Sequence, residues 1–190
     1  MNTPQVDERR IRQLVELSTQ ALAGGRTQDA DRLLRQAQAE APRHPLVVTE
    51  TSRRLLLSGN AAGAHQLLTQ ALAADPSQLS LWLNLAAALR GLGRPEEEMA
   101  ALNKVLAGEP RNMRALLQKA SLQELQGQPR AAAMTFRYAL QMIPPGFDPP
   151  PPLQPILQQA KAVVDANDRA LEVFLEERLR DLRAQYPGEP

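Results

Sequence analysis

Residues 79–112 read LSLWLNLAAALRGLGRPEEEMAALNKVLAGEPRN, and this stretch decides the fold because its landmarks recur along the chain. Its glycine Gly93 belongs to a series spaced by 34 residues: Gly25, Gly59, Gly93 and Gly127. Its proline belongs to a second series with the same spacing: Pro42, Pro76, Pro110 and Pro144. A fixed period of 34 residues in a chain rich in Ala and Leu is typical of helix–turn–helix repeats stacked into a solenoid.

Four repeats can be placed at residues 11–44, 45–78, 79–112 and 113–146. We call each position of the aligned repeats a column and number it from the first residue of the repeat; several columns hold residues of one kind. Columns 8, 20 and 27 hold mostly small side chains, whereas column 24 holds a large apolar one: Leu34, Leu68, Leu102 and Phe136. Small residues let neighbouring helices approach closely, and the glycine and the proline end the two helices of each repeat. Glu98 departs from the alanines of column 20, so we expect its carboxylate to reach the edge of the fold or find a partner.

This pattern resembles the tetratricopeptide repeat (TPR) family over residues 11–146, and Trp82 with Leu85 makes the third repeat the best match. The resemblance implies an all-α fold, a right-handed α-solenoid of four TPR repeats plus a C-terminal capping helix. We therefore expect the four repeats within residues 1–146, a Pro-rich linker over 147–154, a long amphipathic helix over 155–185 and a tail over 186–190.

The segment after the repeats combines a proline run with a helical pattern. Pro149–Pro152 predict an extended polyproline conformation, which we interpret as a stiff spacer, with an SH3-type ligand as the alternative. Beyond Pro155 an apolar stripe recurs at helical spacing: Leu157, Ala160, Val164, Leu171, Phe174, Leu175, Leu179 and Leu182. We expect this helix to cap the fourth repeat, with a connector or dimerisation helix as the alternative. Residues 165–168 leave its continuity open.

Composition excludes several classes of function. The 22 basic and 21 acidic side chains are interleaved and nearly cancel, which argues against a nucleic-acid-binding surface. The chain has no cysteine, so disulfides and thiolate metal sites are excluded. The longest apolar run, Leu85–Leu89, is far too short to span a membrane, and residues 1–7 are polar, unlike a signal peptide. We therefore expect a cytoplasmic protein that binds neither nucleic acid nor membranes.

A second, narrower resemblance covers about residues 80–182. Residues 116–120, 138–145 and 160–175 look like the N-terminal half of bacterial proteins in which TPR repeats precede an aspartyl/asparaginyl β-hydroxylase domain. That family uses Fe(II) and 2-oxoglutarate in a jelly roll of β-strands, and no strand pattern follows Pro155. The resemblance therefore implies, as the alternative function, a substrate-presenting or regulatory TPR half whose catalytic domain is absent from this chain.

No residue set in the sequence predicts catalysis. The two histidines, His44 and His65, stand in neither an H-x-D nor an H-x-H arrangement, and we expect them to be solvated or to cap helices. Glu96–Glu98 open a helix, where acidic residues complement the helix dipole. Phosphate-binding loops and a Ser/His/Asp set with recognisable context are absent. We therefore expect no enzyme activity, no cofactor and no metal.

The TPR resemblance implies that the first helix of each repeat lines a concave groove. The candidate groove residues are Thr49, Arg53, Leu83, Asn84, Arg90, Arg114, Leu117 and Gln118. Their mixed character suits an extended peptide or a partner helix, so we expect a non-catalytic scaffold that binds a protein or peptide. Some TPR modules hold a peptide's terminal carboxylate in these columns; Asn84 and Arg114 fit that pattern, Arg53 replaces an expected Asn, and Thr49 and Gln118 do not fit.

The alternative for this face is a solvated groove with scattered charges. For the oligomeric state we expect a monomer, with a dimer through the C-terminal helix as the alternative.

Overall fold

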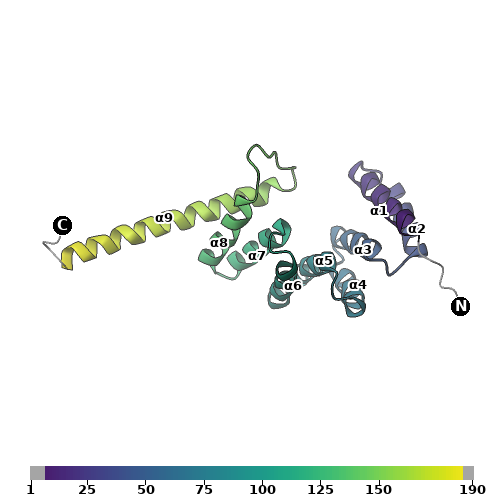
Figure 1. The fold of residues 1–190 in the computed structure, drawn as a ribbon, viewed down its shortest axis with the longest axis horizontal. Coiled ribbons are helices and arrows are strands. Elements are labelled where there is room, and N and C mark those ends of the chain that lie inside the picture. The colour runs from purple at the N-terminus through teal and green to yellow at the C-terminus, as the bar shows by residue number, and fades with distance from the viewer. Residues whose placement is uncertain (1–6, 186–190) are drawn as a thin grey trace. The chain divides into compact units, whose positions relative to one another are not determined.

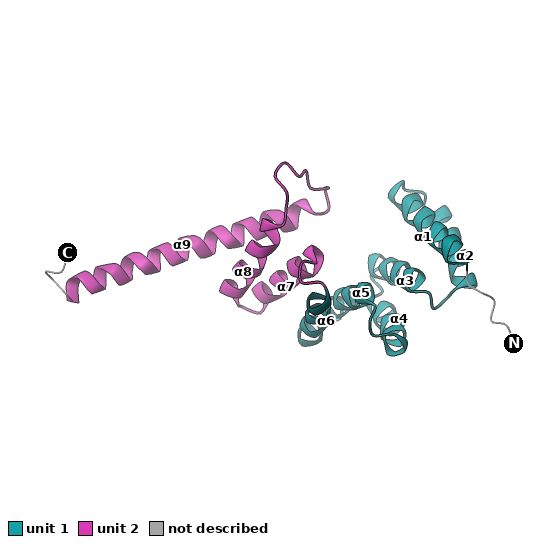
Figure 2. Cartoon of the chain, in the orientation of Figure 1, with its two compact units in different colours: residues 1–108 teal, residues 109–190 magenta. Residues whose placement is uncertain are grey.

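The computed structural model describes residues 7–185, and every regular element in that range is an α-helix (Figure 1). The helices are α1 (Glu8–Ala23), α2 (Thr27–Glu40), α3 (Pro45–Leu57), α4 (Ala61–Ala74), α5 (Leu79–Gly91), α6 (Pro95–Gly108), α7 (Met113–Leu125), α8 (Pro129–Gln141) and α9 (Gln154–Gln185). The predicted tail at residues 186–190 lies outside the described part. The chain divides into two compact units, which we call unit 1 (Met1–Gly108) and unit 2 (Glu109–Pro190) (Figure 2).

Unit 1 consists of three stacked helix pairs. Helix α1 packs against α2, α3 against α4 and α5 against α6, while α3 also contacts α1, α2 and α5. Helices α3 and α5 begin at Pro45 and Leu79, one period of the sequence apart. Ile11, Leu14 and Val47 form part of a buried cluster that joins the first helix pair to α3. No helix pair buries its apolar face alone, and stacking supplies the missing surface.

The turn within each repeat uses its glycine as predicted. Gly93 has a φ of 66°, and the equivalent glycines have φ of 75° (Gly25), 79° (Gly59) and 71° (Gly127). After Gly93, the Arg94 amide donates to the Leu89 carbonyl at 3.0 Å. The turn therefore supplies a hydrogen-bond donor to one of the carbonyls at the end of α5, where the helix itself offers none. A β-branched side chain at this φ is strongly disfavoured, which explains the choice of glycine.

The columns predicted to be small are buried. Ala30, Ala64 and Ala132 of column 20 have no exposed surface, and Phe136 of column 24 is also fully buried. Glu98, the departure from this column, is 2% exposed and pairs with Arg90. The expectation that its carboxylate finds a partner is confirmed.

Unit 2 contains the pair α7 and α8, and α9 packs against α8. Leu157 and Ala160 of α9 are buried, and Asp168 of α9 forms an ion pair with Arg137 of α8. Helix α9 runs without a break through residues 165–168, so the four polar and small residues there do not divide it. The first residues of the apolar stripe predicted from the sequence are therefore buried, in the part of α9 that begins the helix.

The second half of the proline run departs from the predicted extended conformation, whereas Pro149 and Pro150 belong to no turn or helix. Residues 151–153 form a turn, in which the Leu153 amide donates to the Pro150 carbonyl at 2.8 Å. The proline ring restricts φ to about −65°, a value that occurs in helical turns as well as in polyproline. The hydrogen bond from the Leu153 backbone amide stabilises the turn, and the turn leads directly into α9.

Candidate functional site

The structure places five of the eight candidate groove residues on unit 1 and three on unit 2. Thr49 and Arg53 lie on α3, and Leu83, Asn84 and Arg90 lie on α5, which contacts α3. The remaining three lie on α7: Arg114, Leu117 and Gln118. The sequence period thus puts every candidate on the first helix of a repeat, and the first five lie on two adjacent helices.

Asn84 joins α5 to α3 through its side-chain amide. The residue is 6% exposed, and its Nδ2 donates to the Thr49 carbonyl at 3.1 Å and to Ser52 Oγ at 2.9 Å. Ser52 Oγ in turn donates to the same carbonyl, within α3, at 2.9 Å, so it is the Asn84 amide that joins the two helices. Leu83 is also 6% exposed. Both side chains are therefore buried and leave little surface for a ligand to contact.

Arg53 is held by a carboxylate of its own helix. Its Nε and Nη2 donate to Glu50 Oε2 at 2.8 Å and to Glu50 Oε1 at 2.6 Å. The Glu50 side chain is 6% exposed, whereas the Arg53 side chain is 35% exposed. A bidentate pair with a buried carboxylate fixes the plane of the guanidinium, while its Nη1 takes no part in the pair.

Arg90 has a similar arrangement on α5. Its Nε and Nη2 reach Glu98 Oε1 at 2.8 Å and 2.6 Å, and its side chain is 38% exposed beside a carboxylate that is almost fully buried. Both arginines thus hold a buried carboxylate of this chain. A ligand carboxylate at either arginine would compete with Glu50 or Glu98, whereas a neutral carbonyl would not need to displace them.

The unit 2 candidates differ in exposure. Arg114 is exposed, Gln118 is half-buried and Leu117 is 3% exposed. The Ser121 hydroxyl, one turn further along α7, donates to the Leu117 carbonyl at 3.0 Å. Arg114 is therefore the candidate on this helix whose side chain is most accessible to a ligand.

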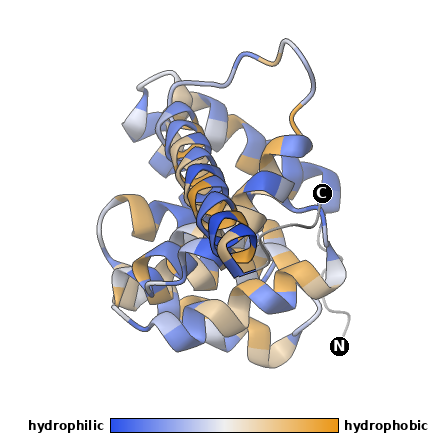
Figure 3. Ribbon diagram, turned by 90° about the vertical axis from the view of Figure 1, so that its left-hand side faces the viewer, coloured by the Kyte–Doolittle hydropathy of each residue, from blue (hydrophilic) through white to orange (hydrophobic). Residues whose placement is uncertain are grey.

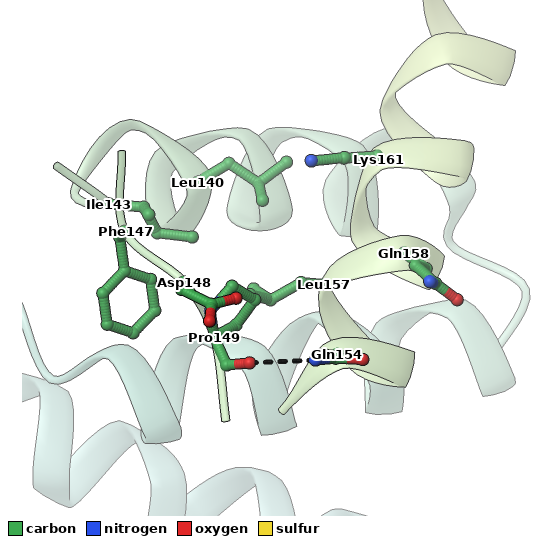
Figure 4. A pocket seen from close by; sticks show the side chains of 9 residues that line it. All are labelled: Leu140, Ile143, Phe147, Asp148, Pro149, Gln154, Leu157, Gln158 and Lys161. Atoms are coloured by element: carbon green, nitrogen blue, oxygen red, sulfur yellow. Dashed lines mark hydrogen bonds between the residues drawn. The ribbon is translucent and has the colours of Figure 1, made fainter. Parts of the chain in front are cut away.

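A cavity that sequence reasoning missed lies in unit 2, between the end of α8, the linker and the first turns of α9. Its volume is about 480 Å³, and Leu140, Ile143, Phe147 and Leu157 supply apolar lining, with Asp148 and Lys161 among the charged groups around it (Figure 4). Gln154 Nε2 donates to the Pro149 carbonyl at 3.1 Å, which ties the linker to α9 beside the cavity (Figure 4). Most of its lining residues lie beyond the fourth repeat, in the linker and the start of α9, so the repeat pattern carries no signal for this cavity.

Another cavity, of about 490 Å³, lies in unit 1 between α2 and α3. Leu22, Leu55 and Leu57 supply apolar lining, and Arg54 of α3 beside them forms an ion pair with Asp31 of α2. This pair links the first helix pair to the second, so its evident role is structural.

The histidines act as helix caps and hydrogen-bond partners. His44 caps α3, since its Nδ1 accepts from the Leu46 amide at 3.2 Å and its Nε2 lies 2.8 Å from Glu8 Oε2. His65 Nε2 lies 3.1 Å from Arg94 Nη1. The prediction of a capping imidazole is confirmed for His44. Across residues 7–185, no group of three His, Asp or Glu side chains is arranged to hold a metal ion.

Asp75 organises the turn before α5. The Ser77 hydroxyl donates to its Oδ1 at 2.6 Å, and the side-chain Nε2 of Gln78 donates to its Oδ2 at 2.7 Å. These hydrogen bonds, that of the Ser77 hydroxyl most of all, hold the pKa of the Asp75 carboxyl below its ordinary value. In the same turn Trp82 Nε1 donates to the Pro76 carbonyl at 2.8 Å.

In the described part of the chain, none of the helices has the length and apolar character needed to cross a membrane.

Comparisons with known proteins agree with this architecture. Residues 55–120 match the tetratricopeptide repeat family model. No curated protein matches the chain. Among solved structures, TTC0263, a thermophilic TPR protein of Thermus thermophilus, is similar with a TM-score of 0.67 and 22% identity, over 94% of this chain and 93% of that one.

Two further structures show the same fold. MamA is similar with a TM-score of 0.56 and 18% identity, over 71% of this chain and 79% of that one. The APC/C hetero-tetramer Cut9–Hcn1 contains a chain that is similar with a TM-score of 0.64 and 19% identity, over 77% of this chain and 29% of that one. The fold class is therefore that of the all-helical TPR solenoids, as the sequence predicts.

Proposed function

We propose that this protein is a non-catalytic scaffold that binds an extended peptide or a protein segment along the first helices of its repeats. The observation that carries this proposal is the pair of fixed arginines on α3 and α5. Buried Glu50 and Glu98 hold Arg53 and Arg90, yet about a third or more of each arginine side chain stays exposed, at 35% and 38%. Donors that are already held in place lose little conformational entropy when a ligand binds.

The chemistry of this surface favours main-chain carbonyls of a ligand over a carboxylate. Each guanidinium already carries a carboxylate partner, so it has little uncompensated charge to offer a second one. Asn84 contributes indirectly, because its amide fixes α5 against α3 and thereby sets the spacing of the two helices. This arrangement suits an extended segment with exposed backbone carbonyls.

The alternative function, the TPR half of an Fe(II)/2-oxoglutarate-dependent hydroxylase, rests on the resemblance of residues 80–182 alone. None of the matches described above is to a hydroxylase. We therefore keep the scaffold as the proposed function.

Panning the immobilised chain against a phage-displayed random peptide library tests the proposal. Affinities of the selected peptides, measured by fluorescence anisotropy, are compared between wild type and the double variant Glu50→Gln with Arg53→Gln. Removing both partners leaves no buried charge unpaired but removes the fixed guanidinium, and we expect at least about a tenfold loss of affinity.

The matched control is Asp29→Asn with Arg32→Gln, which removes an exposed ion pair from α2. It should bind as wild type does. A library that yields no specific peptide, or equal affinity in the two double variants, contradicts the proposal. Arg114→Glu, compared with Arg130→Glu on α8, extends the same assay to unit 2.

A further inference from the structure

The second half of α9 has no packing partner in the described structure. Only Leu157 and Ala160 of this 32-residue helix are buried, and every residue from Arg169 to Gln185 is exposed. Figure 1 shows this part of α9 running on past α8, against which its first half packs. Figure 3, which looks along the helix, shows apolar residues among the polar ones at its exposed end.

All but one of the large exposed apolar side chains of this segment fall on one face of the helix, and Val173 is the exception. Leu171, Phe174, Leu175, Leu179 and Leu182, which we call the C-terminal stripe, follow one another at helical spacing and are 40–53% exposed. The stripe continues the face that buries Leu157 and Ala160 at the start of the helix, so it extends an existing interface. A helical segment of this length without tertiary contacts is marginally stable in water, and therefore calls for a partner.

We propose that the C-terminal stripe is a dimerisation surface, occupied by the same stripe of a second copy of this chain in antiparallel orientation. The order of residues along the stripe supports this occupant, because it reads nearly alike in both directions about the midpoint between Glu176 and Glu177. Antiparallel pairing about that point brings Leu171 level with Leu182 of the second copy. It also brings Phe174 level with Leu179 and Leu175 level with Arg178, so four of the five stripe residues have an apolar side chain at their level.

The charges select the antiparallel orientation over the parallel one. Arg178 lies on the same helix face as the stripe, and parallel pairing in register would place two copies of this arginine against each other, where their like charges repel. Antiparallel pairing instead places Arg178 level with Leu175 of the second copy, where its apolar stem packs and its cation reaches water. On the flank of the stripe, Glu172 comes near Arg183 of the second copy, and the two-fold axis produces this opposite-charge pair twice.

The apolar area that the C-terminal stripe can bury predicts a dimer that dissociates on dilution. The exposed fractions of the five stripe residues leave roughly 500 Å² of apolar surface per copy. Pairing two copies then buries about 1,000 Å², which is at the low end of specific interfaces. This inference does not depend on the peptide-binding surface, since the groove candidates lie on α3, α5 and α7.

Sedimentation velocity of the full chain over a dilution series tests the proposal. Wild type should shift from dimer to monomer on dilution, and Leu175→Glu with Leu182→Glu should sediment as a monomer throughout. The matched control is Val173→Glu, because Val173 is 55% exposed on the same helix but points away from the stripe. It should retain the dimer. A wild type that is monomeric at every concentration, or a control that dissociates like the stripe variant, overturns the proposal.

Disulfide cross-linking tests the orientation of the two helices. Because the chain has no native cysteine, only the introduced cysteines can form the disulfide. A mixture of Glu172→Cys and Arg183→Cys chains should form the mixed disulfide under mild oxidation, whereas each variant alone should form little. Efficient cross-linking of Glu172→Cys with itself would mean a parallel pair and would overturn the antiparallel arrangement.

Discussion

The ion pair between Arg90 and Glu98 predicts an asymmetric response to mutation. Glu98 is 2% exposed, whereas the Arg90 side chain is 38% exposed. Arg90→Ala leaves a carboxylate buried without its partner, and removing one member of such a pair costs about 3 kcal/mol. Glu98→Ala leaves the arginine in contact with water and restores the alanine that the other repeats carry in this column. We therefore expect it to cost less than about 1 kcal/mol.

The double variant makes the test specific to the pair. If the buried charge is the cause, Arg90→Ala with Glu98→Ala should be about as stable as Glu98→Ala alone, a coupling of about 3 kcal/mol. For a chain of this size, the single Arg90→Ala change should lower Tm by roughly 6–12 °C.

Urea unfolding followed by fluorescence of Trp82 is a suitable assay. This is the single tryptophan of the chain, and it lies on α5 together with Arg90, so it reports the stability of the element that carries the pair. Equal losses for the two single variants, or a double variant whose loss is the sum of both, would refute the argument from burial.

Three further predictions concern the fold itself. Gly93→Val should lower Tm clearly more than Gly93→Asn, since asparagine tolerates the φ of 66° far better than a β-branched residue; equal melting curves would contradict this account. Phe136→Ala should cost about 3–5 kcal/mol in chemical unfolding followed by circular dichroism, because the ring is fully buried. Asp75→Ala should lower Tm at neutral pH, and this difference should vanish as the pH falls through the lowered pKa of the Asp75 carboxyl. A difference that persists in acid would exclude the charge as its cause.

The periodic features of this protein were predictable because they follow from local rules. The glycine in each turn needs a positive φ, and the proline after each second helix prevents its continuation, so both appear at fixed positions in the sequence. The small residues of columns 8 and 20 mark the closest approach of helices, and the structure buries them.

The roles of the candidate site residues were less predictable. Column position places Asn84 and Arg53 on adjacent helices. It does not show that the Asn84 side-chain amide donates both of its hydrogen bonds to α3. The spacing of Glu50 and Arg53 by three residues was a usable signal for their pair, since such residues are neighbours on a helix. The pair of Arg90 and Glu98 bridges two helices, and no local pattern encodes it.

By itself the sequence determined the repeating features of this protein: the turn at each glycine, the small and large residues of the buried columns and which face of α9 is apolar. These properties depend on backbone geometry and on periodicity, which a single chain segment already contains. Only the tertiary structure decided how the polar groups are used and where burial stops. Asn84 and Glu98 find their partners across helix contacts, and the apolar face of α9 is covered as far as α8 extends, because contact between elements is set by packing and not by the character of one helix.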